Sequence, residues 1–162
     1  MRRSRTVASL LAAALIAMLA FAAVAVATNA HFIRASASGP NSSGNLVVSF
    51  KIAGLGDNET ITVTTTADAT AVYACRNNGG NFPSDPKKTA VSGPVSASGQ
   101  FTSGQNGQIT GSLTLTPPST TLNCPNGQHQ VLVSVSYTNV AVSGGGDTES
   151  IPGTFSRTFF NI

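Results

Sequence analysis

Tryptophan is absent from this chain of 162 residues, and charged residues make up only 9% of it. Tyrosine and histidine occur only twice each. A carbohydrate-binding module that stacks sugar rings on a row of surface aromatics would need more aromatic residues than this. A nucleic-acid-binding protein would need a clustered basic face to neutralise phosphates. The composition therefore argues against both classes of protein.

The formal net charge of +3 comes from Arg2, Arg3 and Arg5, close to the start of the chain. From residue 31 onward, six basic residues balance six acidic ones. A neutral domain carries no field that would attract the phosphates of nucleic acid. We therefore expect no nucleic-acid partner.

The first 30 residues have the order of a secretory signal, in which the basic cluster precedes an apolar run over residues 7–26 and small residues follow. Cleavage after Ala27 would release Thr28 as the first residue, whereas cleavage after Ala30 would release His31. The run approaches the roughly 20 residues that span a bilayer, so an uncleaved membrane anchor is the alternative, but no basic stop-transfer cluster follows. We predict a helical signal peptide over residues 1–30 and a secreted, extracellular protein, either released or held at the cell surface, with no membrane span once the signal is removed.

Cysteine occurs only at positions 75 and 124. A thioredoxin-like redox site would place its two cysteines only two residues apart. In a secreted protein, two distant cysteines most simply form one structural disulfide. We therefore predict a bond between Cys75 and Cys124, which closes a loop of about 50 residues and stabilises the fold by roughly 4 kcal/mol in the chain-entropy model.

Apolar residues alternate with polar ones from residue 31 onward, and Gly, Pro and Asn interrupt the alternation at short intervals. Over residues 46–52, for example, Val48, Phe50 and Ile52 fall on one face of a strand. No window has helical periodicity of useful length. The pattern predicts one all-β domain over residues 31–162, an immunoglobulin-like antiparallel sandwich of about seven or eight strands. A small barrel is the alternative.

Three motifs resemble those of a family. They are Ala53-Gly54-Leu55-Gly56, the stretch from Cys75 to Pro83 with the pattern C-x-N-x-G-G-N-x-P, and the pair Cys124-Pro125. In these motifs the chain is similar to a group of small secreted bacterial β-sandwich proteins, most of them uncharacterised. The similarity spans nearly the whole expected domain. It implies an extracellular location and a β-sandwich, and it implies no particular activity.

Catalysis by an acid–base pair requires two carboxyl groups brought together in a cleft. The six acidic residues of the chain lie in or near turns, where solvation accounts for them. No Gly-x-Ser-x-Gly elbow is present, and a Ser-His-Asp triad would have to use His31 or His129. We therefore expect a protein that is not an enzyme and has no cofactor.

A copper site is the alternative function. If cleavage follows Ala30, His31 presents a free amine and an imidazole together, and His129 is available as a third nitrogen donor. Such a site would resemble the histidine brace of lytic polysaccharide monooxygenases and related copper-binding sandwiches, a tetragonal nitrogen site suited to Cu(II). A polysaccharide-cleaving face usually carries exposed aromatics, which are scarce here, and cleavage after Ala27 would exclude the brace.

The longest irregular stretch, over residues 75–88, is a candidate binding loop, because loops held on a rigid sandwich often carry binding residues. Its candidate polar rim consists of Asn77, Asn78, Asn81, Lys87 and Lys88. The other interpretation is a glycine-rich loop anchored by the disulfide. We expect a non-enzymatic sandwich with a structural, adhesive or ligand-binding role, whose partners are a cell-surface component, a matrix component or further copies of the chain paired through edge strands.

Overall fold

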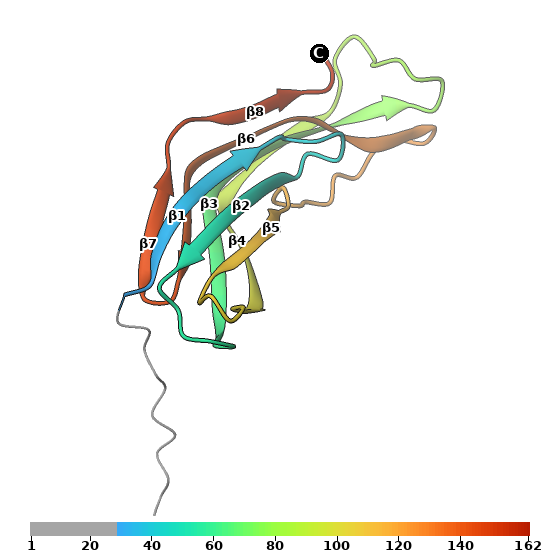
Figure 1. The fold of residues 1–162 in the computed structure, drawn as a ribbon. Coiled ribbons are helices and arrows are strands. Elements are labelled where there is room, and N and C mark those ends of the chain that lie inside the picture. Colours follow the sequence, from blue (N-terminus) through green and yellow to red (C-terminus); the bar gives the residue numbers. More distant parts are fainter. Residues whose placement is uncertain (1–28) are drawn as a thin grey trace, which may run out of the picture.

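A computed structural model describes residues 29–162, which form eight strands and no helix (Figure 1). The strands are β1 (His31–Ser38), β2 (Leu46–Ala53), β3 (Thr60–Asn77), β4 (Lys88–Thr102), β5 (Ile109–Leu115), β6 (Gln128–Gly144), β7 (Asp147–Ile151) and β8 (Phe155–Thr158). The predicted signal peptide lies outside the described residues, apart from its last two positions. Within residues 29–162, no helix is long and apolar enough to cross a membrane.

Two antiparallel sheets pack face to face. The smaller sheet has the order β1-β2-β5, and the larger has the order β4-β3-β6-β7, with β8 also paired to β6. Strands β1, β2 and β5 take the places of strands A, B and E of an immunoglobulin-like sandwich, and β4, β3, β6 and β7 take those of C′, C, F and G. The predicted fold class is therefore confirmed.

The core lies between the two sheets and follows the alternation of the sequence. On β2, the side chains of Val48, Phe50 and Ile52 are buried, as predicted, because alternate residues of a strand point to the same face. They pack against alternate small and β-branched residues of β3, such as Val63 and Ala67, and against the inward residues of β6. Phe50 meets Phe101 of β4 edge to face, with ring centroids 5.1 Å apart.

Strands β3, β4 and β6 continue beyond the smaller sheet (Figure 1), and the segment over residues 116–127 packs on this part of the larger sheet. The disulfide between Cys75 and Cys124 holds the segment there, with Cα atoms 5.5 Å apart, so this prediction is confirmed. The hydroxyl of Tyr73 donates to the carbonyl oxygen of Pro118 over 2.9 Å. Gln130 binds the segment twice, because its amide donates to Thr120 O and accepts from the backbone N–H of Leu122.

Three of the four sheet edges, all except that at β5, are interrupted. On β1 the register shifts between Phe32 and Arg34, which makes Ile33 a bulge residue. Pro94 stands near the middle of β4, and it has no N–H to offer a further strand. The opposite edge breaks between β7 and β8. Bulges and prolines at edges discourage strand addition, which weighs against the expected self-association through edge strands.

Candidate functional site

The outer face of the larger sheet carries an array of hydroxyl groups. Alternate residues of β3 place threonines on this face, and β4 and β6 add serines beside them. Three hydroxyl pairs bridge β3 and β4 at 2.8 Å each: Thr60 with Thr102, Thr64 with Ser98, and Thr70 with Ser92. These hydroxyls make the face polar without adding charge.

A bulge in β6 interrupts this array. Thr66 lies opposite Ala141 and Asp68 lies opposite Thr138, so β6 has one residue more than β3 between these pairs. Asn139 accommodates the bulge at φ 52°, a left-handed conformation that asparagine adopts more readily than most residues. Its side-chain amide donates a 2.8 Å hydrogen bond to Oδ2 of Asp68 on β3. The bulge therefore places an amide next to a carboxylate on the outer face.

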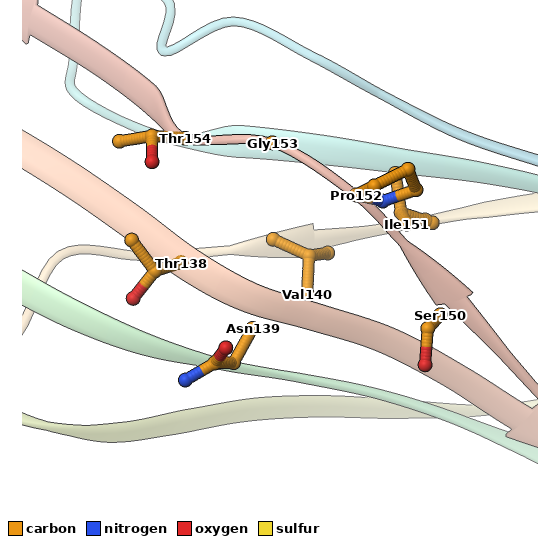
Figure 2. A pocket seen from close by; sticks show the side chains of 8 residues that line it. All are labelled: Thr138, Asn139, Val140, Ser150, Ile151, Pro152, Gly153 and Thr154. Atoms are coloured by element: carbon orange, nitrogen blue, oxygen red, sulfur yellow. The ribbon is translucent and has the colours of Figure 1, made fainter.

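The bulge coincides with the break between the two short strands that flank β6. Strand β7 pairs with residues 140–144 of β6 and β8 pairs with residues 134–137, so Thr138 and Asn139 have no strand partner on this side. The chain between the two short strands passes through Pro152, Gly153 and Thr154. The result is an open depression of about 510 Å³, named here the edge depression (Figure 2). It is lined by residues 138–140 of β6 and by residues 150–154.

A second depression, of about 340 Å³, adjoins the first on the outer face and is named the central depression. Its polar lining comes from three neighbouring strands: Asp68 and Thr70 on β3, Ser92 on β4, and Ser136 and Thr138 on β6. Thr138 lines both depressions. The two depressions together, with Asp68 and Asn139 at their junction, are called the bulge site.

The side chains of the bulge site are suited to hydrogen bonding. Serine and threonine hydroxyls donate and accept, the amide of Asn139 does both, and the carboxylate of Asp68 accepts only. Asp68 is the single ionisable side chain among the residues that line the two depressions. The site therefore offers a set of hydrogen bonds around one negative charge.

The residues predicted to form a binding loop lie at the end of the long sheet farthest from β7. Asn78, Asn81, Lys87 and Lys88 are exposed there, and the hydrogen bonds that hold the loop in place are internal. The backbone N–H of Asn77 donates to Asn81 O over 2.9 Å, and that of Asn78 donates to Gly127 O over 3.0 Å. The ammonium group of Lys87 donates to Asn123 O over 2.8 Å, and Lys88 begins β4. These bonds tie the loop to the segment that carries Cys124, as in the interpretation of an anchored loop.

The structure does not bring His31 and His129 together. His31 begins β1 beside the end of β6, where the backbone N–H of Phe32 donates to Asp147 just after that strand. His129 lies at the other end of β6, which has 17 residues and is therefore about 55 Å long at roughly 3.3 Å per residue. One chain cannot bind a single copper ion with both imidazoles in this arrangement. Between residues 29 and 162, no three His, Cys, Asp or Glu residues gather as a metal site would require.

Sequence reasoning did not identify the bulge site. Asp68 was interpreted as one of the solvated turn residues, although it lies within the 18-residue strand β3. A signal for the bulge is present, because the apolar alternation of β6 changes phase between Tyr137 and Val140 while both side chains stay buried. Two polar residues between two inward residues, one more than a regular strand has, are typical of a bulged strand.

No protein family, curated protein or solved structure matches this chain. Sandwiches of this architecture occur in many proteins of unrelated function, so the fold alone does not specify one. Function is therefore inferred from the geometry of the bulge site.

Proposed function

We propose that this chain is a secreted or surface-associated, non-enzymatic β-sandwich that acts as an adhesive or ligand-binding module through its bulge site. The observation that carries the proposal is the coincidence of the β6 bulge with the break between β7 and β8. Two adjoining depressions lie at this point of the outer sheet face. Bulges at sheet edges often serve to re-aim side chains at functional sites.

Rigidity of the surrounding sheet supports a binding role. The bulge site lies on three paired strands that the core holds from the other face, with Tyr137 and Val140 buried beneath Thr138 and Asn139. Sites built on strands keep their side chains in place more precisely than sites built on loops. A ligand would therefore meet donors and acceptors that are already ordered, which lowers the entropic cost of binding.

Two features support an extracellular setting. The disulfide is compatible with an oxidising compartment, and the first residues of the chain have the order of a secretory signal. In that setting, a neutral surface rich in hydroxyl groups suits adhesion to a cell surface or an extracellular matrix.

Retention on intact cells tests the proposal. The exported full-length protein is labelled, incubated with the cells that secrete it, and the bound fraction is measured after washing. We expect wild-type protein to be retained and the variant Thr138→Val/Asn139→Gly to lose most of its retention, because glycine tolerates the positive φ while the amide is removed. The control variant Thr62→Val/Ser96→Ala changes the same face outside both depressions.

Either of two results would contradict this function. Absence of retention for the wild-type protein would remove the adhesive role. Equal loss of retention in the bulge-site variant and the control variant would show that the bulge site is not the binding surface. Circular dichroism of each variant establishes that the fold is kept.

A further inference from the structure

We infer that the bulge site binds a neutral saccharide chain. This inference rests on the binding role proposed above and adds the chemical class of the ligand. Three properties of the site lead to it: the charge of its lining, its mixture of donors and acceptors, and the shape of its two depressions.

Charge excludes anionic ligands from the site. The residues that line the two depressions include no lysine, arginine or histidine, and Asp68 contributes a negative charge. Phosphate, sulfate and carboxylate groups would be repelled by Asp68 and would find no cation to bind. The ligand is therefore neutral in the part that enters the site.

The polar groups of the site match vicinal hydroxyls. A sugar hydroxyl both donates and accepts, and so requires partners of both kinds. Oδ2 of Asp68 lies 2.8 Å from the amide nitrogen of Asn139, so a carboxylate acceptor and an amide lie side by side. Thr70, Ser136 and Thr138 surround them with further hydroxyls. An aliphatic ligand would displace water from the remaining donors and acceptors of these groups without replacing its hydrogen bonds, which lowers affinity.

The shape of the site favours an extended ligand. The edge and central depressions adjoin at Thr138, so a chain can lie across both and place successive units in each. An extended peptide would instead add to a sheet edge along a strand length. The stretch of β6 left unpaired between β7 and β8 comprises only Thr138 and Asn139, which is shorter than the strands of globular proteins.

The lining contains no aromatic ring, so binding at this site does not depend on the sugar stacking that the composition argues against. Affinity comes from hydrogen bonds alone, and the most sensitive of these are the bonds to the charged carboxylate. We expect Asp68→Asn, which keeps the shape of the side chain, to weaken binding about tenfold. Thr70→Val should weaken it less, and the control Ser96→Ala should leave it unchanged.

Affinity gel electrophoresis of the exported protein tests the inference directly. The gels contain a neutral polysaccharide (glucan, mannan, xylan or soluble chitin fragments) or the anionic polysaccharide alginate. We expect retardation by at least one neutral polysaccharide, reduced in Asp68→Asn and Thr70→Val but not in Ser96→Ala. Retardation by alginate alone, or retardation that none of the bulge-site variants changes, would overturn the inference.

The retention assay separates failure of this inference from failure of the proposed function. Mild periodate cleaves vicinal diols of surface saccharides, and protease removes surface proteins. We expect periodate treatment of the cells to abolish retention and protease treatment to leave it. Retention that survives periodate and is lost after protease keeps the binding function but identifies a protein ligand, which overturns the saccharide. Absence of retention on untreated cells together with absence of retardation by every neutral polysaccharide overturns both.

Discussion

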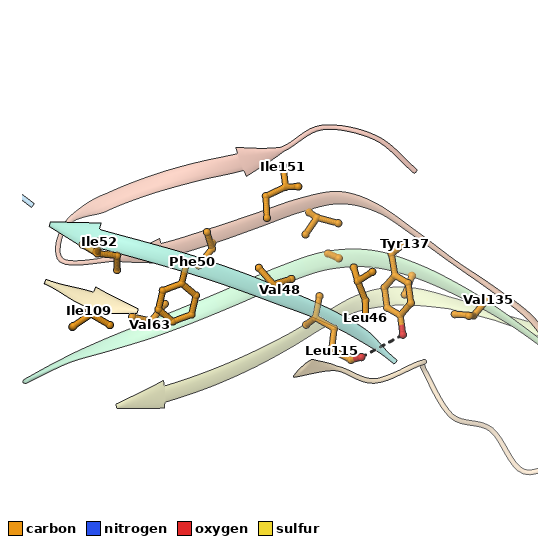
Figure 3. Close-up of a cluster of buried hydrophobic side chains, with 14 of the residues drawn as sticks. Leu46, Val48, Phe50, Ile52, Val63, Ile109, Leu115, Val135, Tyr137 and Ile151 are labelled. Carbon is orange, nitrogen blue, oxygen red and sulfur yellow. Dashed lines mark hydrogen bonds between the residues drawn. The ribbon is translucent and has the colours of Figure 1, made fainter. Parts of the chain in front are cut away.

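The hydroxyl of Tyr137, on β6 of the larger sheet, donates a 2.8 Å hydrogen bond to the carbonyl oxygen of Gly44, in the loop between β1 and β2 of the smaller sheet. The same hydroxyl lies 3.5 Å from the carbonyl oxygen of Leu115 at the end of β5 (Figure 3). The ring is fully buried in the core. One side chain thus connects β6 to two segments of the opposite sheet.

This burial predicts loss of stability at alkaline pH. Desolvation, with a smaller contribution from Tyr73, raises the pKa of Tyr137 from 10.0 to about 12. The unfolded chain releases this proton near pH 10 whereas the folded chain retains it, so the contribution of the neutral hydroxyl is complete below pH 10 and is lost as the pH rises towards 12. A shift of about two units corresponds to about 2–3 kcal/mol.

Urea unfolding at a series of pH values measures this effect. Tyr137→Phe should remove most of the decline between pH 10 and 12, at a cost of about 1–2 kcal/mol at neutral pH, because Gly44 O loses a buried donor. Tyr73→Phe is the matched control. Its hydroxyl is also desolvated, which raises its pKa by less, so most of the decline should remain. An equal decline in the wild-type protein and in Tyr137→Phe would contradict the assignment.

Removal of the disulfide should destabilise the protein and loosen one part of it selectively. The double variant Cys75→Ala/Cys124→Ala loses a cross-link over 49 residues, which contributes about 4 kcal/mol in the chain-entropy model. Hydrogen exchange should accelerate most in the segment over residues 116–127, whose backbone N–H at Leu122 depends on Gln130. Amides of β2 in the main core are the internal reference. A larger acceleration of exchange in β2 than in residues 116–127 would contradict this expectation.

Replacing each of three glycines by alanine should lower the free energy of unfolding by three different amounts. At Gly107, φ is +63° and an added Cβ would collide with the carbonyl group of Leu55, which the loop holds through the hydrogen bond from Leu55 N to Gly107 O. Gly107→Ala should therefore cost about 2–4 kcal/mol. Gly127→Ala has the positive φ without the collision and should cost about 1–2 kcal/mol.

The third member, Gly79, has open space around it and no positive φ, so Gly79→Ala should change stability by less than about 0.5 kcal/mol. Thermal and urea unfolding of the three variants give the order. A cost for Gly79→Ala as large as that for Gly107→Ala would show that the loss of glycine itself, rather than the local geometry, determines the result.

The sequence was informative where a strand alternates without interruption. Val48, Phe50 and Ile52 of β2 could be placed in the core because a regular two-residue period assigns each side chain to a face. The disulfide could be predicted because two cysteines in a chain that begins like a secretory precursor leave a single pairing. Neither inference requires knowledge of which strands are neighbours.

Where a strand is irregular, the sequence does not assign its side chains to the correct face. Strict alternation would place Val131 on the same face as Val135, but the register shift opposite Val72 and Tyr73 of β3 changes this, so that Leu132 packs against the core and Val131 lies opposite Ala74. Such a shift moves every following side chain to the other face. The bulge site was beyond reach for a further reason, because it combines residues of three strands whose order in the sheet no local pattern encodes.

Packing of the residues before β1 bears on the site of signal cleavage. Ala30 is partly buried against the core, next to Gly145 in the turn between β6 and β7. The carbonyl group of Asn29 lies so close to Gly54 that a side chain there would collide with it, and it lies 2.8 Å from Nδ1 of His31. Asn29 and Ala30 therefore belong to the folded domain.

We accordingly expect the exported protein to begin at Thr28, the result of cleavage after Ala27, because cleavage after Ala30 would remove residues that cover Gly54 and Gly145. Intact mass spectrometry of the exported protein distinguishes the two sites, and the same measurement with and without reductant reports the disulfide. Blocking cleavage at the first site with Ala27→Arg, since signal peptidases require small residues there, should reduce the yield of mature protein. A mass that corresponds to a first residue of His31 would contradict this expectation.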